Sequence, residues 1–182
     1  MVKTMLTTKE MDKALKYQKR SKIAFKIIML ALLALWIPVA IDKLTDFETF
    51  KSGIYNQPFS DSLGNVLIYT LPVLECATII CLIYEGWRKV GLILSTMLMT
   101  AFTGYVGIAL LGAWKKLPCG CGSVISGMSW ERHFLFNLFF LFLSLSGLYL
   151  WRKLRSGDAG SEAAKGGSAK RHIKQYSLTS KF

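Results

Sequence analysis

The sequence is poor in acidic residues, cysteine, histidine and proline. Its 182 residues include 11 Asp and Glu, 4 Cys, 2 His and 4 Pro, against 23 Lys and Arg. Four cysteines are too few for a small domain that disulfides alone hold together. The chain also lacks a nucleotide-binding fingerprint, a haem-attachment motif and the ligand spacing of a complete metal site. These absences exclude several common classes of soluble enzyme.

The basic residues are gathered at the two ends of the chain. Eight of the 23 lie in residues 1–26 and eight in residues 152–182, which leaves 7 for the 125 positions between them. Hydrophobic residues nevertheless make up 52% of the chain, and the mean hydropathy is +0.37. A chain that separates apolar and basic residues in this way is not a soluble protein with a mixed surface.

Four apolar stretches, each of helical length, occupy the middle of the chain. They are residues 27–40, 63–84, 90–114 and 134–151. A helix needs ~20 such residues to cross a hydrocarbon core of ~30 Å, and it keeps all its backbone hydrogen bonds within one segment. The sequence therefore predicts an all-α, integral membrane protein that is a bundle of four transmembrane helices.

The first of these stretches is short, so we expect its helix to begin within residues 21–26. A cleaved signal peptide is the main alternative for it. The charged lead before it is long, however, and no small-x-small cleavage site follows Ala40. We therefore expect this helix to be retained.

The charges of the loops predict the orientation. The tails and the short turn at residues 85–89 are basic, whereas residues 42–62 carry four acids against two lysines. Because cytoplasmic loops carry the excess of Lys and Arg, we expect both termini in the cytoplasm. Residues 42–62 and 115–133 then face outward from the cytoplasmic membrane.

Three regions follow from this organisation. Residues 1–26 form a basic cytoplasmic N-terminal segment, residues 27–151 the four-helix transmembrane domain, and residues 152–182 a basic, flexible cytoplasmic tail. Within the tail, the composition of residues 156–168 is typical of a linker. The basic ends are expected to set the topology or to dock another membrane component, and not to bind nucleic acid, because no aromatic residues interleave with the charges.

The candidate chemistry lies in the second outward loop, where Cys119 and Cys121 are separated by one glycine. A disulfide across one intervening residue closes a very small ring, and strain makes a disulfide easier to reduce. This spacing therefore favours a pair that cycles between dithiol and disulfide. A surface thiol pair without a role and a metal half-site that uses His133 remain alternatives.

Polar residues inside the apolar stretches indicate a second group of candidates. Glu75 lies in the middle of the second stretch, where a carboxylate needs a partner or a proton. His133, Asn137 and Ser144 share one face of the fourth helix. We expect Glu75 to face the bundle interior and to be bridged by His133, Asn137, Thr103 or water. Thr103, Asn137 and Ser144 are predicted to be interior polar residues.

Five short motifs, in order along the chain, resemble the DoxX-like, MauE-type (methylamine-utilisation) family of bacterial redox-associated membrane proteins. They are IDKLTDFETF at residues 41–50, LPVLE at 71–75, FTGY at 102–105, PCGCG at 118–122 and WERHFLFN at 130–137. The resemblance covers residues 27–151. It implies a compact four-helix bundle in the cytoplasmic membrane that supports disulfide formation or electron supply for proteins outside that membrane.

Two classes of function follow. In the first, the protein is a thiol–disulfide oxidoreductase of the membrane. Cys119 and Cys121 exchange with a periplasmic thioredoxin-like or secreted protein, a membrane carrier such as a quinone completes the circuit, and Glu75 and His133 handle protons. In the second, it is a non-catalytic subunit or assembly factor of a larger envelope complex, in contact through its basic tails. The first class needs both thiols, and the second tolerates serine at both positions.

Overall fold

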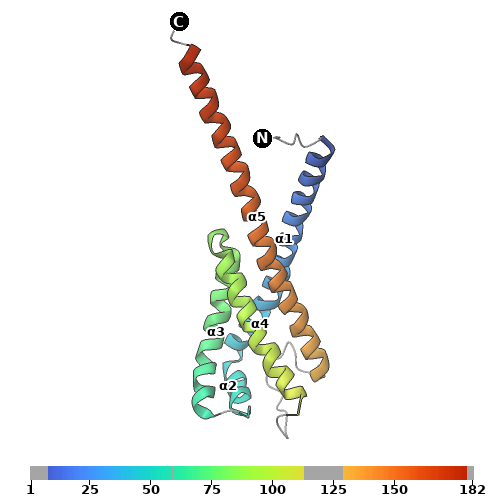
Figure 1. The fold of residues 1–182 in the computed structure, drawn as a ribbon. Coiled ribbons are helices and arrows are strands. Elements are labelled where there is room, and N and C mark those ends of the chain that lie inside the picture. Colours follow the sequence, from blue (N-terminus) through green and yellow to red (C-terminus); the bar gives the residue numbers. More distant parts are fainter. Residues whose placement is uncertain (1–7, 59, 113–128, 180–182) are drawn as a thin grey trace. The chain divides into compact units, whose positions relative to one another are not determined.

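The computed structural model describes residues 8–58, 60–112 and 129–179 of the chain. Within these ranges the regular structure is helical (Figure 1). The elements are α1 (Thr8–Thr45), α2 (Phe47–Tyr55), α3 (Asp61–Ile83), the single 3-10 turn η1 (Glu85–Trp87), α4 (Arg88–Leu110) and α5 (Trp130–Thr179). Contacts divide the chain into two units, Phe25–Leu148 and the two terminal segments together, Met1–Ala24 with Tyr149–Phe182.

Four of the described helical segments are long and apolar enough to cross a membrane. They are Lys9–Thr45, Asp61–Ile83, Glu85–Leu110 and Trp130–Ser156. Each overlaps with one of the four apolar stretches of the sequence, so the prediction of an all-α protein with four membrane-spanning helices is confirmed. The surroundings of this chain are therefore a lipid bilayer.

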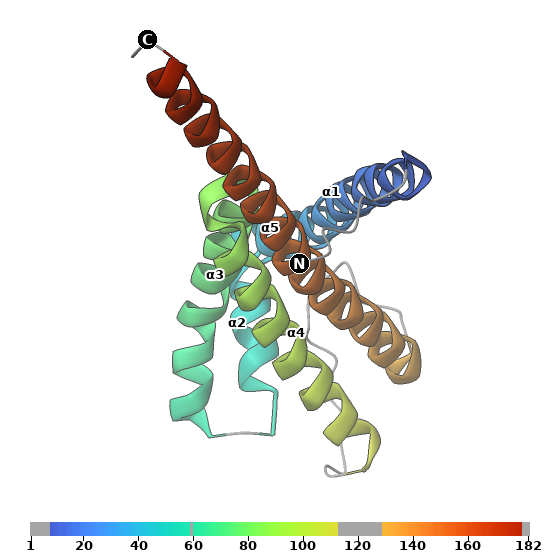
Figure 2. The same cartoon turned by 45° about the horizontal axis from the view of Figure 1, so that its top comes forward.

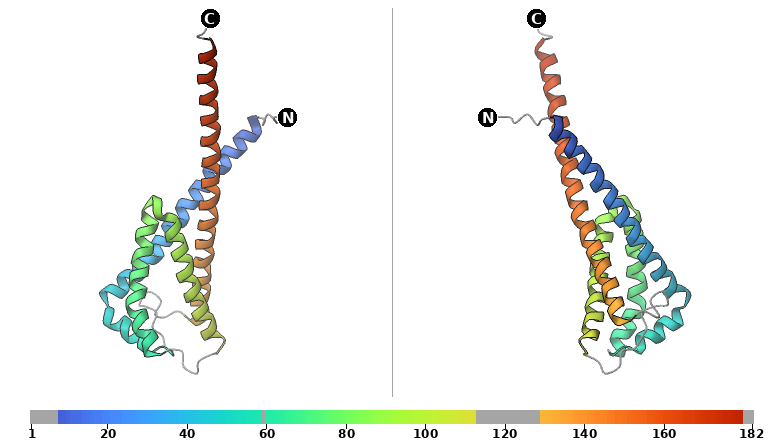
Figure 3. Two further views of the ribbon diagram at one scale, coloured as in Figure 1. Left: turned by 60° about the vertical axis from the view of Figure 1, so that its left-hand side comes forward. Right: turned by 90° about the vertical axis from the view of Figure 1, so that its right-hand side faces the viewer.

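Helices α3 and α4 form a closely packed pair, joined by η1, and they run side by side (Figures 1 and 3). Gly91, near the start of α4, lies against the end of α3. A methyl group at this glycine would come 2.7 Å from the backbone nitrogen of Leu82. Helices in membranes approach closely where small residues face each other, and Gly91 provides such a contact.

A chain of hydrogen bonds connects α1, α4 and α5. The Trp36 indole donates to the Ser95 hydroxyl at 2.9 Å, and the Ser95 and Ser144 hydroxyls lie 2.8 Å apart. All three side chains are fully buried. The Trp36–Ser95–Ser144 seam, as we call it, therefore satisfies its own polar groups inside the bundle.

The short helix α2 lies in the stretch that the sequence analysis treats as a loop. Asp46 caps its first turn by accepting a hydrogen bond from the Thr49 backbone N–H. Its buried residues Phe50 and Ile54 pack against Ile68 of α3. Figure 2 shows α2 beside the first half of α3. An amphipathic helix with a capping aspartate thus covers part of the bundle where a plain loop was expected.

The terminal unit contains the start of α1 and the end of α5. The Lys153 ammonium donates to the Tyr17 hydroxyl at 2.6 Å and lies 4.5 Å from the centre of the Tyr17 ring. The backbone of α5 is helical to Thr179, where the sequence predicted a flexible linker over residues 156–168. Alanine, glutamate and lysine in that stretch have good helix propensity, and a helix that already exists extends without a new nucleus.

Candidate functional site

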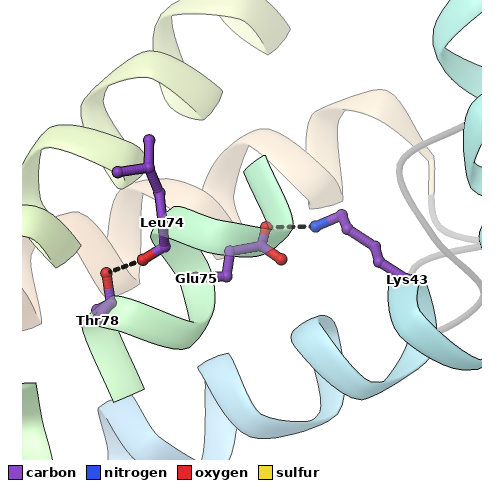
Figure 4. Close-up of polar contacts among 4 residues, drawn as sticks. All are labelled: Lys43, Leu74, Glu75 and Thr78. Atoms are coloured by element: carbon purple, nitrogen blue, oxygen red, sulfur yellow. Dashed lines mark hydrogen bonds and ion pairs between the residues drawn. The ribbon is translucent and has the colours of Figure 1, made fainter. Parts of the chain in front are cut away.

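The site centres on an ion pair between α1 and α3. Lys43 lies in the last turn of α1, and its Nζ donates a hydrogen bond to Oε1 of Glu75 on α3 (Figure 4). The side chains are 7% and 0% exposed, respectively. Charged side chains are almost never buried to this degree unless they are paired. The pair therefore places two opposite charges, with no net charge, inside an apolar bundle.

The pair lies deep along α3. Glu75 follows the first residue of α3, Asp61, by 14 positions, which is ~21 Å along a helix axis. Because Lys43 reaches Glu75 from the last turn of α1, this helix ends part-way along α3, and α2 continues beside the remaining half. This arrangement explains why the first apolar stretch of the sequence is short: α2 fills the space beyond the end of α1.

Aromatic rings surround the lysine. Its Nζ lies 5.6 Å from the centre of the Phe50 ring and 5.8 Å from that of Phe102. A cation at such a distance from the face of an aromatic ring is attracted by the ring quadrupole. Two rings and one carboxylate thus hold the ammonium group in place. The second carboxylate oxygen, Oε2 of Glu75, has no hydrogen-bond partner among the described residues.

A cavity of about 210 Å³ lies next to Lys43. Its walls are mostly apolar and include Leu71, Phe50, Phe102 and Phe136, from four different helices. Its polar lining comes from four side chains besides the ion pair's lysine. They are Gln57, Tyr105, His133 and Asn137. The cavity is therefore an apolar space with a few polar groups at fixed positions, which is the usual composition of a small-molecule site.

Two of these polar side chains bind each other, and one lacks a partner. The Tyr105 hydroxyl donates to Oε1 of Gln57, whose amide nitrogen donates to the Gly53 carbonyl oxygen at 2.9 Å. Asn137 is only 3% exposed, and its Nδ2 has no hydrogen-bond partner in the part of the chain that the structure describes. A buried amide nitrogen without an acceptor is costly, and such a group needs an explanation.

Of the polar residues that the sequence indicated as candidates, some line the cavity and others do not. His133 and Asn137 line the cavity, and His133 is buried with its ring beside that of Trp130. Thr103 is buried and donates to the Met99 carbonyl oxygen of its own helix at 2.6 Å. Ser144 belongs to the Trp36–Ser95–Ser144 seam. The last two side chains are thus interior polar residues that do not line the cavity.

Glu75 faces the bundle interior, but its partner differs from those expected. His133, Asn137, Thr103 or water were the expected partners, whereas in the structure Lys43 donates a hydrogen bond to Glu75. The sequence did contain a signal for this pair. Between residues 27 and 87 the basic residues are Lys43 and Lys51, and Lys43 directly follows the apolar stretch. A buried acid in one helix makes the nearest base in another helix its natural partner.

The thiol pair and its alternative, a metal half-site that also uses His133, both need Cys119 and Cys121. Cys119 and Cys121 lie outside the described residues, so their prediction stays a prediction. Cys76 and Cys81 of α3 are free thiols. Among the described residues, no group of three or more His, Cys, Asp or Glu side chains is placed to hold a metal ion.

The ion pair and the cavity beside it can together transfer protons and hold a small ligand. A carboxylate and an ammonium group in hydrogen-bond contact can pass a proton between them without changing the net charge of the site. The neighbouring cavity provides an apolar space beside this pair, lined by a histidine that can also carry a proton. The site therefore combines proton-carrying groups with room for a small ligand.

Comparison with known proteins gives one match. The family model described as methylamine utilisation protein MauE matches residues 21–151, which contain every residue of the site. No curated protein and no solved structure matches the chain.

Proposed function

This chain belongs to the MauE family, and from that premise we propose an accessory redox role in methylamine utilisation for it. The protein is a multi-pass membrane protein. Our proposal places it in the bacterial cytoplasmic membrane, with residues 1–26 and 152–182 as basic cytoplasmic extensions of the transmembrane domain at residues 27–151. The concentration of Lys and Arg at both ends of the chain supports this orientation.

The proposed reaction is thiol–disulfide exchange at Cys119 and Cys121. The disulfide between them accepts two electrons from a dithiol of a periplasmic thioredoxin-like or secreted protein, through a mixed disulfide. The partner leaves with a disulfide, and Cys119 and Cys121 become thiols. Reoxidation of these thiols to the disulfide releases two electrons and two protons, and a membrane quinone would supply the oxidising capacity to accept them as it becomes a quinol.

The observation that carries this proposal is the composition of the cavity. Its walls include Phe102 and Tyr105, near the end of α4, and His133 and Asn137, near the start of α5. These are the helices that precede and follow the Cys119–Cys121 motif in the sequence. The wall of this apolar cavity includes proton-carrying groups from these two helices. This supports a coupling of thiol chemistry to proton transfer. In this proposal, Glu75 and His133 carry the protons.

Trapping of mixed disulfides tests the proposal. Membranes that contain the Cys119→Ser or the Cys121→Ser variant are quenched with acid and alkylated, and the adducts are identified by mass spectrometry. We expect one of these two variants to accumulate a covalent adduct with the partner, because the thiol that resolves the intermediate has been removed. The matched controls are Cys76→Ser and Cys81→Ser, which leave the proposed pair intact.

Full function without the two thiols would contradict the proposal. If the Cys119→Ser/Cys121→Ser double variant supports full function of the system in cells, thiol exchange is excluded. The non-catalytic subunit or assembly factor is then the remaining function for this family member.

The orientation has its own test. After reduction, a membrane-impermeant maleimide applied to intact spheroplasts is expected to label Cys119 and Cys121 in a Cys76→Ser/Cys81→Ser background. Labelling that requires permeabilisation would place the motif in the cytoplasm and overturn the proposed orientation.

A further inference from the structure

We infer that the cavity beside Lys43 binds the head group of a quinone, and that Asn137 is the residue that recognises it. This inference rests on the proposed function, because it supplies a binding site for the carrier in that scheme. Four properties of the cavity favour a quinone: its size, its walls, its hydrogen-bonding groups and its charge.

The size of the cavity fits a single ring. Cavities for drug-sized ligands measure ~300–1,000 Å³, and this cavity measures about 210 Å³. One substituted six-membered ring matches such a space. Phe50, Phe102 and Phe136 provide aromatic walls against which a flat ring packs well.

Two groups at the cavity are donors that can bind a further acceptor. Nδ2 of Asn137 is buried without a partner among the described residues. An ammonium group has three N–H bonds, and Lys43 directs one of them to Glu75, which leaves two. A ligand that satisfies these donors must offer acceptors, as the carbonyl oxygens of a quinone do. Methylammonium offers donors alone and would leave both groups unsatisfied.

The charge of the site favours a neutral ligand. The positive charge of Lys43 is already balanced by Glu75, whose Oε2 has no partner among the described residues. A fatty-acid carboxylate would bring a second negative charge next to Glu75, in a medium where charges interact strongly. A quinone adds acceptor oxygens without adding charge. The volume of the cavity, its aromatic walls, its hydrogen-bond donors and the balanced charge of the ion pair all favour the same ligand. This ligand is a neutral ring that carries carbonyl groups.

Binding can be measured on the full chain in detergent micelles. The probe is decylubiquinone, a benzoquinone with a short alkyl tail, and the signal is the quenching of tryptophan fluorescence. Trp36 is a suitable reporter, because its ring lies 6.3 Å from that of Phe102 in the cavity wall. We expect quenching that saturates at one quinone per chain.

Two variants connect this binding to the cavity. Asn137→Leu removes the unpartnered donor, and we expect the dissociation constant to rise about tenfold, the effect of one lost hydrogen bond in a buried site. Ala101→Phe enlarges a side chain of the cavity wall and removes no polar group, and should weaken binding at least as much. The matched control is Asn65→Leu. Asn65 lies on the exposed face of α3, where it accepts a hydrogen bond from the Tyr55 hydroxyl at 2.5 Å, and neither residue lines the cavity, so this change should leave the constant unchanged.

The possible outcomes separate this inference from the proposed function. The Cys119→Ser/Cys121→Ser double variant should bind the quinone as the wild type does. If it does and the trapping experiment fails, the site stands and the thiol reaction falls. If thiol exchange is observed but quenching never saturates, or Asn137→Leu and Asn65→Leu bind alike, the inference is overturned. Displacement of the probe by laurate or methylammonium, at concentrations comparable with that of the probe, also overturns it.

Discussion

Two groups of buried polar residues in the bundle differ in how completely their hydrogen bonds are made. In the Trp36–Ser95–Ser144 seam, the indole N–H and both hydroxyls take part in short hydrogen bonds. In the other group, Lys43, Glu75 and Asn137, one carboxylate oxygen and one amide nitrogen have no partner within the described residues. A cavity adjoins this second group, which we call the open cluster.

This difference indicates that the seam stabilises the fold, whereas the open cluster serves binding. A polar network that satisfies itself holds helices together, and in membranes such bonds contribute ~0.6–1.7 kcal/mol each. Buried groups that stay unpaired lower stability, so their presence needs a reason other than packing. We therefore expect changes in the seam to alter the stability of the bundle, and changes at Asn137 to alter what the protein binds.

The largest effect is expected from breaking the ion pair. Lys43→Met leaves Glu75 buried without its counter-charge, which should lower the free energy of unfolding by about 3–5 kcal/mol. Lys43→Met combined with Glu75→Leu removes both charges and should recover most of that loss. Unfolding by SDS in mixed micelles measures both values.

The control for this prediction is Lys51→Met. Lys51 is 38% exposed, and its nitrogen lies 3.9 Å from a carboxylate oxygen of Glu48. Exposed pairs contribute ~0–1 kcal/mol, so this variant should be close to the wild type. A double variant as unstable as Lys43→Met alone would show that the loss does not come from an unpaired charge.

Close packing between α3 and α4 gives the next effect. In Gly91→Ala the added methyl group would lie 2.7 Å from the backbone of Leu82, and backbone cannot move aside as a side chain can. We expect a loss of about 1–3 kcal/mol, as for other overpacked sites. Gly104→Ala in the same helix meets nothing within 4 Å and should be neutral or slightly stabilising. Equal unfolding free energies for the two variants would contradict the close contact.

A smaller loss is expected from the seam. Ser95→Ala removes the hydroxyl that bonds both Trp36 and Ser144, and should lower the free energy of unfolding by about 1–2 kcal/mol. Thr96→Val is the control, because the Thr96 hydroxyl bonds the Leu92 carbonyl oxygen within its own helix at 2.7 Å. If Thr96→Val loses as much, the bonds between helices are not what stabilises this region.

The smallest effect on stability belongs to the open cluster. Asn137→Leu replaces an amide whose nitrogen has no partner among the described residues by an apolar side chain of similar size, in an apolar wall. Its free energy of unfolding should stay within about 1 kcal/mol of the wild type, or rise. A loss comparable to that of Ser95→Ala would mean that Asn137 holds the bundle together, as the seam does.

The sequence predicted the parts of this architecture that depend on single segments. The length of each apolar stretch is sufficient to predict four membrane-spanning helices, and the cost of an unpaired carboxylate in lipid predicts that Glu75 faces inward. Both properties are local, so no knowledge of the neighbouring helices is needed. The burial of Asn137 follows in the same way from its position in the fourth stretch.

Features of the structure that depend on contacts between different helices were harder to predict. A lysine just after an apolar stretch normally extends to the interface, and Lys43 turns inward only because α1 ends part-way along α3. Helix α2 was missed because its stretch carries charges of both signs. Its capping Asp46 and the apolar spacing of Phe47, Phe50 and Ile54 were nevertheless readable signals. The cavity depends on five segments at once, which a single sequence does not reveal.

The most direct test of the account compares Asn137→Leu with Ser95→Ala in membranes that contain quinone. The protein is reduced, and the reoxidation of Cys119 and Cys121 is followed by alkylation at equal amounts of folded protein. The account predicts slow reoxidation in Asn137→Leu despite its unchanged stability, and a wild-type rate in Ser95→Ala despite its lower stability. Rates that follow stability in both variants, or a wild-type rate in Asn137→Leu, would contradict it.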